Sequence, residues 1–264
     1  MKYYIHTDLE GISGFVDLDE IDIKQSRGIQ YTKEILTEEV NSAIRGIRKA
    51  DSSAEFLVQD GHGGGWWGPN IIFEKLDPAA SLIQGKRGSE IVGLDASFDL
   101  LLHIGAHSMA GTHHGLMSHT ISMDAIHNVW INGRKMGEIG LVATYAGYFG
   151  VPVGLVSGDY WAVLEAQELL GKIEGVAVKK GLNQNTAVCL AYEVTIKMIE
   201  EQAEIAAKRA KSFTPLNIEG GLELKIEYVK TTLADKAEIR GAKRIDGRTV
   251  SFFGENITEV IDLI

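Results

Sequence analysis

The sequence predicts an α/β fold, in which a mostly parallel sheet is flanked by helices and followed by a smaller C-terminal α+β unit. Three apolar runs at residues 2–7, 56–59 and 100–104 have the length of buried strands. Within residues 29–50, apolar side chains recur at three- and four-residue steps, which indicates an amphipathic helix between the first two strands. Strand, helix and strand in this order predict a βαβ unit with a right-handed crossover. After residue 222 apolar and charged side chains alternate, which is typical of an antiparallel sheet with one solvated face.

The remaining elements follow from periodicity and turn chemistry. Asn132-Gly133 is a hairpin signal, Asp159 is placed to cap a helix, and Asn256 with Glu259 resembles a capping box. Further strands are expected at residues 80–83, 125–131, 151–156, 222–228 and 249–253, and further helices at 137–149, after 159, at 191–211, at 232–240 and after 256. We divide the chain into a larger α/β domain, residues 1–175, and a smaller α+β unit, residues 176–264.

Composition narrows the class of protein. A net charge of −10 argues against binding to nucleic acids and to anionic membrane surfaces, since both require basic patches. No run approaches the roughly 20 apolar residues that span a bilayer, and the first strand follows Met1 without a signal-peptide pattern. The single cysteine, Cys189, excludes an intrachain disulfide, and its neighbours Val188 and Leu190 predict that it is buried. A cytoplasmic location is expected.

Metal-ligand side chains lie just beyond each of the first three apolar strands. Asp8 and Glu10 follow the first strand, His62 follows the second, and His107 follows the third. In an open parallel sheet, the carboxyl ends of the strands meet along one edge, where ligands bind. Taken singly, a strand-end Asp is more often a turn or helix cap than a ligand. The convergence of four such side chains at one edge therefore carries the prediction of a metal site.

Glu138, just after the hairpin, is a fifth candidate ligand, although it could equally balance the dipole at the start of a helix. Mixed carboxylate and imidazole ligands suit zinc, with manganese or cobalt as substitutes, and this set suffices for a two-metal site. His6 and His103 are expected to be core residues, and His113 and His114 lie in a polar loop that requires no function.

Other catalytic motifs are absent from the sequence. No glycine-rich dinucleotide or phosphate loop follows the first strand, and no Gly-x-Ser-x-Gly motif is present, which disfavours nucleotide enzymes and serine hydrolases. Trp66 and Trp67, in a glycine-rich loop beyond His62, could form either loop packing or a substrate wall.

Ordered motifs across residues 1–160 resemble those of the D-aminopeptidase family, dinuclear zinc peptidases of the dipeptide-transport-operon type. The matching segments are residues 8–14 (Asp-Leu-Glu-Gly-Ile-Ser-Gly), 60–62 (Asp-Gly-His), 105–107 (Gly-Ala-His), 115–119 (Gly-Leu-Met-Ser-His), 131–134 (Ile-Asn-Gly-Arg) and 137–141 (Gly-Glu-Ile-Gly-Leu). The similarity continues weakly through Val178-Lys179-Lys180 and fades in the last 50 or so residues. The paired His113 and His114 depart from the family pattern.

The resemblance implies two Zn²⁺ ions per subunit and a specific role for each candidate side chain. Asp8 would bridge the ions, Glu10 and His107 would complete one set of ligands, and His62 and Glu138 the other. His119 matches the catalytic histidine of the family, acting on a short peptide substrate that contains D-residues.

The resemblance also implies a ring-shaped decamer. The apolar and small residues of 137–156, together with the separate C-terminal unit, suggest surface buried between copies of the chain.

Two rival functions stay open. One is a different dinuclear-metal amidohydrolase or phosphoesterase on the same ligands, although phosphoesterases usually add basic side chains and only Arg134 lies near the motifs. The other is a non-catalytic metal- or peptide-binding ring, which would need the ligands but not His119. The sequence does not distinguish D- from L-residue substrates.

Overall fold

Seven strands form the larger of two sheets within the residues that the computed structural model describes, which are 1–17, 26–62, 68–85, 91–218 and 220–264. Their order is β3-β2-β1-β4-β7-β8-β9, and all neighbours are parallel except β8 and β9. The strands are β1 (Lys2–Thr7), β2 (Glu55–Gln59), β3 (Ala80–Ile83), β4 (Leu100–Ala106), β7 (Val153–Asp159), β8 (Glu174–Asn183) and β9 (Thr186–Cys189). The predicted mostly parallel sheet is confirmed. Trp66 and Trp67 lie outside the described residues.

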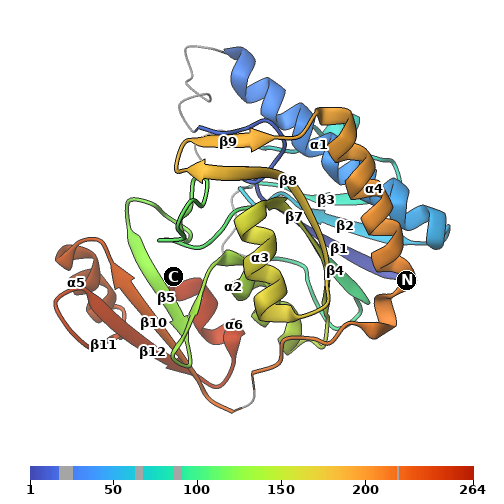
Figure 1. Ribbon diagram of the computed structural model, residues 1–264. Coiled ribbons are helices and arrows are strands. Elements are labelled where there is room, and N and C mark those ends of the chain that lie inside the picture. Colours follow the sequence, from blue (N-terminus) through green and yellow to red (C-terminus); the bar gives the residue numbers. More distant parts are fainter. Residues whose placement is uncertain (18–25, 63–67, 86–90, 219) are drawn as a thin grey trace.

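Helices cover both faces of this sheet (Figure 1). From β1 the chain moves to one side through α1 (Ser26–Ala50) to β2, whereas from β4 it moves to the other side through α2 (Glu138–Tyr148) and α3 (Tyr160–Leu170) to β7 and β8. Because each crossover is right-handed, the reversal of direction places α1 on one face and α2 and α3 on the opposite face. The strand order therefore reverses between β1 and β4.

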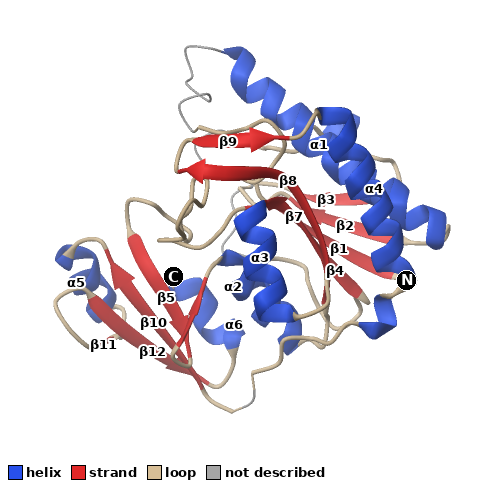
Figure 2. Cartoon of the chain, in the orientation of Figure 1, coloured by secondary structure: helices blue, strands red, loops and turns tan. Residues whose placement is uncertain are grey.

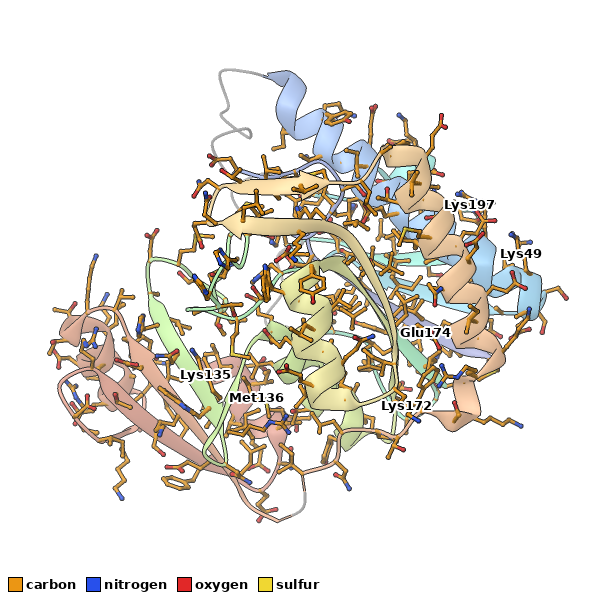
Figure 3. All side chains as sticks on the ribbon, viewed as in Figure 1. Lys49, Lys135, Met136, Lys172, Glu174 and Lys197 are labelled. Carbon is orange, nitrogen blue, oxygen red and sulfur yellow. The ribbon has the colours of Figure 1, made fainter. Side chains whose placement is uncertain are left out.

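The outer helix α4 (Tyr192–Lys208) packs beside α1 on the same face. Glu200 of α4 forms ion pairs with two residues of α1, Arg45 at 3.1 Å and Lys49 at 2.6 Å. Figure 3 shows Lys49 and Lys197 on the outer side of this helix pair, away from the sheet. The helix predicted at 191–211 is shorter in the structure. It ends at Lys208 and is followed by the short 3-10 turn Ala210–Ser212.

A second, antiparallel sheet lies beside the first (Figure 2). Its order is β11-β12-β10-β5-β6, and its bounds are β5 (Ile126–Ile131), β6 (Arg134–Met136), β10 (Leu222–Tyr228), β11 (Lys243–Arg244) and β12 (Thr249–Gly254). It packs with α5 (Thr231–Ile239) and α6 (Ile257–Val260) around a separate apolar core. Further 3-10 turns span Phe73–Lys75 and Ile261–Leu263.

The second sheet is built from two separate parts of the chain. The hairpin β5–β6, from the middle of the chain, pairs with β10, so it joins the second sheet. Conversely β8, which spans residue 175, and β9 and α4, which lie beyond it, belong to the layers of the first sheet. A division at residue 175 stays a prediction about which segments fold independently.

Two predictions about burial are wrong. Cys189 is exposed because it ends β9, the edge strand of the larger sheet, and its neighbours Val188 and Leu190 are 58% and 40% exposed. The apolar residues of 137–156 are mostly buried inside this chain, in α2 and β7, and apart from the half-exposed Tyr148 they offer little surface to copies of it.

The expected core histidines are confirmed. His6 and His103 face each other across β1 and β4, at 3% and 2% exposure, with ring centroids 4.8 Å apart. Asn256 caps the last helix as expected, since its side chain accepts from the Thr258 N–H. Asp159 begins α3, but its carboxylate accepts from the backbone N–H groups of Gly181 and Leu116 instead of capping the helix. No described helix is both long enough and apolar enough to cross a bilayer.

Candidate metal centre

The predicted ligands lie where the strand order of the larger sheet reverses. Asp8 and Glu10 follow β1, His62 follows β2, and His107 follows β4, its neighbour on the other side of β1. Glu138 opens α2, directly after the hairpin of the second sheet. Such a reversal point is the usual binding crevice of an open α/β sheet, because the loops on its two sides diverge to opposite faces.

Backbone contacts between the strand ends bring these side chains together. The Asp8 N–H donates to the Ile104 carbonyl at 2.8 Å, and the Gly11 N–H donates to the Gly105 carbonyl at 2.7 Å. A Cβ atom on Gly11 would lie 2.0 Å from the Ala106 carbonyl oxygen, so only glycine permits this approach. The Asp-Leu-Glu-Gly motif therefore needs its glycine for packing against β4.

The five predicted ligands form one cluster, in which Asp8, Glu10 and His107 are buried and His62 and Glu138 are half-buried. His62 Nε2 lies 3.3 Å from both Asp8 Oδ1 and Glu10 Oε2. On the other side of Asp8, His107 Nε2 lies 3.3 Å from Asp8 Oδ2 and 3.2 Å from Glu138 Oε1. Asp8 thus lies between two groups, as expected for a bridging carboxylate. Apart from those to Asp8, the shortest contacts join His62 to Glu10 and His107 to Glu138, whereas the resemblance implies that Glu10 shares an ion with His107 and His62 shares one with Glu138.

Burial and the close spacing of charged groups shift the pKa values of the cluster residues. Burial, reinforced by the neighbouring Glu10, raises the pKa of Asp8 to about 7. Burial also opposes ionisation of Glu10 and Glu138, but the facing His62 and His107 outweigh it, so the pKa of each carboxyl is lowered. His107 shows the reciprocal effect, since Glu138 and Asp8 overcome its desolvation and raise its pKa well above the ordinary value.

Two histidine rings are oriented by backbone carbonyls. His107 Nδ1 lies 3.0 Å from the Ser108 oxygen, and His119 Nδ1 lies 2.8 Å from the Met117 oxygen. A carbonyl can only accept, so Nδ1 of each ring carries a proton, and Nε2 is the ring atom that faces the cluster. The two rings are stacked with centroids 4.0 Å apart, and His119 Nε2 is 3.8 Å from Glu138 Oε1.

This donor set fits a cationic metal. Asp8 Oδ2, Glu10 Oε2 and His107 Nε2 are buried, and within the described part of the chain none has a hydrogen bond of good geometry, although each lies 3.2–3.3 Å from another member of the cluster. Burying such atoms is costly unless a partner compensates them, and a divalent cation would do so for all three. Two overlapping groups have ligand atoms close enough for one ion: Asp8 with Glu10 and His107, and His107 with His119 and Glu138. The second group makes His119 a rival ligand.

Other predicted residues lie outside the cluster. Asp60, from the Asp-Gly-His motif, is fully buried and accepts from the N–H groups of Asn70 and Ile71, which ties these two residues to the end of β2. His113 and His114 are exposed and lie against each other with tilted rings, whose centroids are 3.7 Å apart. They are therefore surface residues near the loop that carries His119.

Buried polar residues behind the cluster were not found from the sequence. Glu165 of α3 accepts from the Met109 N–H at 2.8 Å, and burial raises its pKa to about 7. Lys179 of β8 and Glu39 of α1 both bond to the segment that carries Asp8 and Glu10. Each belongs to an element distant in sequence, so no local pattern could have identified them. The only signal was the weak resemblance at 178–180.

Comparisons with known proteins agree with this geometry. The sequence model of the D-aminopeptidase family matches residues 1–264. The chain is 34% identical over 263 residues to a D-aminopeptidase of Bacillus subtilis (strain 168), covering 98% of this chain and 93% of that protein. It is also similar to the solved structure of a Zn-dependent D-aminopeptidase from Bacillus subtilis, described as a self-compartmentalizing protease. The TM-score is 0.92 at 32% identity, over 100% of this chain and 95% of that one.

Proposed function

Because the chain belongs to the D-aminopeptidase family, we propose that it is a zinc-dependent aminopeptidase that removes the N-terminal residue of short D-residue-containing peptides. The observation that carries this proposal is the buried cluster of three carboxylates and two imidazoles at the reversal point of the sheet. Hydrolysis by such a site requires neither a serine nor a cysteine nucleophile.

We assign the ligands from their distances. Asp8 would contact both ions, Glu10 and His62 would hold one, and His107 and Glu138 would hold the other. When bound, the ions would polarise the scissile carbonyl and lower the pKa of a water molecule. The carbonyl of Ser108 fixes the ring of His107 so that Nε2 is the ligating atom.

His119 is proposed to move the proton. Its Nδ1–H is engaged by the Met117 carbonyl, which leaves Nε2 able to accept a proton from water and to return it to the leaving amine. Its ring is 9% exposed at the edge of the cluster, whereas His107 is 2% exposed within it. The more exposed position suits a group that must meet substrate.

We also propose that copies of this chain assemble into a ring-shaped decamer in the cytoplasm. The solved relative is described as self-compartmentalizing, and self-association would cover exposed apolar side chains on β9 and the start of α4: Val188, Leu190, Tyr192 and Val194. A chain with one cysteine needs no oxidising compartment. Light scattering should give about ten times the 28.8 kDa mass of one chain, and a monomer at micromolar concentration would contradict the assembly. Cell fractionation tests the location.

The decisive experiment uses paired chromogenic substrates. Zinc-loaded protein should hydrolyse D-alanyl-p-nitroanilide faster than its L-isomer, and a chelator should abolish the reaction. Faster cleavage of the L-isomer would refute the stereochemical part of the proposal. No cleavage of either isomer would refute the aminopeptidase. In that case p-nitrophenyl phosphate tests the rival phosphoesterase, and its failure leaves a non-catalytic binding ring.

A further inference from the structure

A fully buried lysine bonds to the segment that carries two of the proposed ligands. We call residues 8–15 the metal arm. Lys179, on β8, is 2% exposed, and its ammonium donates to the backbone carbonyl of Glu10 at 2.6 Å and to that of Phe15. These two carbonyls lie at the two ends of residues 10–15 in the metal arm. The Lys179 side chain therefore links the two ends of this segment.

Burial of the Lys179 ammonium is energetically unfavourable. Within the part of the chain that the structure describes, Lys179 forms no ion pair at salt-bridge distance. A buried ammonium without a carboxylate in contact is destabilising unless its N–H groups are bonded, and two of its three donors go to the metal arm. A chain that needed only apolar packing here would be served by leucine or methionine.

Other contacts hold the metal arm from different sides. Glu39 of α1, fully buried, accepts from both the N–H and the hydroxyl of Ser13, at 2.8 Å and 2.5 Å. The Ser13 hydroxyl also lies 2.8 Å from the hydroxyl of Thr195 in α4. Along its first half, the arm is bonded to β4 through the Asp8 and Gly11 N–H groups. Lys179 is the contact that reaches a ligand residue's own carbonyl.

We propose that Lys179 is a positioning residue. It would fix the peptide of Glu10 and so orient the Glu10 carboxylate toward the metal. Rotation of that peptide would carry the Glu10 carboxylate away from His62, which lies 3.3 Å from it. The effect is local, because His107 and Glu138 are carried by other segments, after β4 and at the start of α2. The inference rests on the proposed function, since it assumes that Glu10 binds metal.

The test compares Lys179→Met with Lys180→Met. Methionine keeps most of the apolar stem of Lys179 but removes its donors. Lys180 is the exposed neighbour on the same strand, and its ammonium lies over the Tyr160 and Trp161 rings. Metal-stripped proteins are titrated with zinc by calorimetry, and kcat and KM are measured on the loaded proteins. Thermal midpoints of the metal-stripped proteins report whether the fold is intact.

We expect wild type and Lys180→Met to bind two equivalents of zinc with the same affinities. Lys179→Met should bind one equivalent normally and the other about 10–100-fold more weakly, as for other outer contacts of metal ligands. Its kcat should fall while KM changes little. Unchanged binding of both equivalents in a folded Lys179→Met protein would overturn the proposal, and so would equal weakening of both, which indicates a general structural role.

The outcomes separate this inference from the proposed function. If wild type binds no zinc, the proposed function fails before Lys179 is tested. If Lys179→Met does not fold, Ser13→Ala tests the same arm, because it removes only the hydroxyl contacts to Glu39 and Thr195. Ser13→Ala should weaken the same single equivalent by a smaller factor, and normal binding in this variant would then refute positioning through the arm.

Discussion

His119→Ala is expected to remove catalysis while leaving the metal centre and the fold in place. The side chain lies at the edge of the cluster, stacked on His107 and 9% exposed. Its one hydrogen bond among the described residues is from Nδ1 to the Met117 carbonyl, and its Nε2 is 3.8 Å from Glu138 Oε1. These contacts orient a proton carrier but contribute little to the packing of the chain.

The magnitudes follow from those contacts. Losing a positioned acid–base group typically costs 10²–10⁴ in rate, which is about 3–5 kcal/mol of barrier at about 1.4 kcal/mol per tenfold. Losing one neutral hydrogen bond at a partly exposed site costs only about 0.5–1.5 kcal/mol of folding free energy. The effect on turnover should therefore exceed the effect on stability by about 1.5–4.5 kcal/mol.

His107→Ala is the matched comparison. Its Nε2 lies between Asp8 Oδ2 and Glu138 Oε1, at 3.3 and 3.2 Å, so truncation removes a proposed ligand and leaves two carboxylates facing each other. This variant should lose zinc, activity and thermal stability together, because metal binding is coupled to folding. His119→Ala should retain two equivalents of zinc.

The assay measures three quantities on each variant: zinc content by atomic absorption, the thermal midpoint, and kcat on D-alanyl-p-nitroanilide. If His119→Ala loses zinc to the same extent as His107→Ala, then His119 is a ligand, as its grouping with His107 and Glu138 allows, and the proton-transfer role is wrong. If His119→Ala keeps nearly full activity, the ring only packs against its neighbour.

Three further perturbations test the site and its supports. Removing zinc should lower the free energy of unfolding by about 4 kcal/mol relative to protein held at a free zinc concentration a thousandfold above Kd. Denaturation with and without a chelator measures this shift, and identical curves would show that no metal binds. Gly11→Ala should abolish zinc binding, since its Cβ would lie 2.0 Å from the Ala106 oxygen, whereas Gly247→Ala, with open space around it, should behave as wild type. Burial raises the pKa of Glu39 from 4.5 to about 6, so the folded state is penalised as pH rises through this window. Relative to Glu39→Gln, wild type should therefore lose about 2 kcal/mol of stability between pH 4 and 7, and a pH-independent difference would refute this assignment.

The order of elements around the site could be predicted because it depends on local signals. Apolar runs and turn residues identified β1, β2 and β4, and parallel pairing then required Asp8, His62 and His107 to share one edge of the sheet. The helix α1 follows from three- and four-residue periodicity alone. The strands β8 and β9 were missed, since the apolar run in β8 is short and is followed by two lysines, and β9 is mostly exposed.

Tertiary structure decided what depends on contacts between distant segments. Local sequence predicted a buried Cys189, but exposure follows from the place of β9 at the edge of the sheet. The pairing of His62 with Glu10 and of His107 with Glu138 depends on where each strand ends relative to its neighbours. Lys179 acts across 169 residues on the Glu10 carbonyl. The sequence by itself determined which side chains could bind a metal, because ligand chemistry belongs to the residue type. Which ligands lie together, and which residues hold them in place, depends on the tertiary structure, because both arise from contacts between segments distant in sequence.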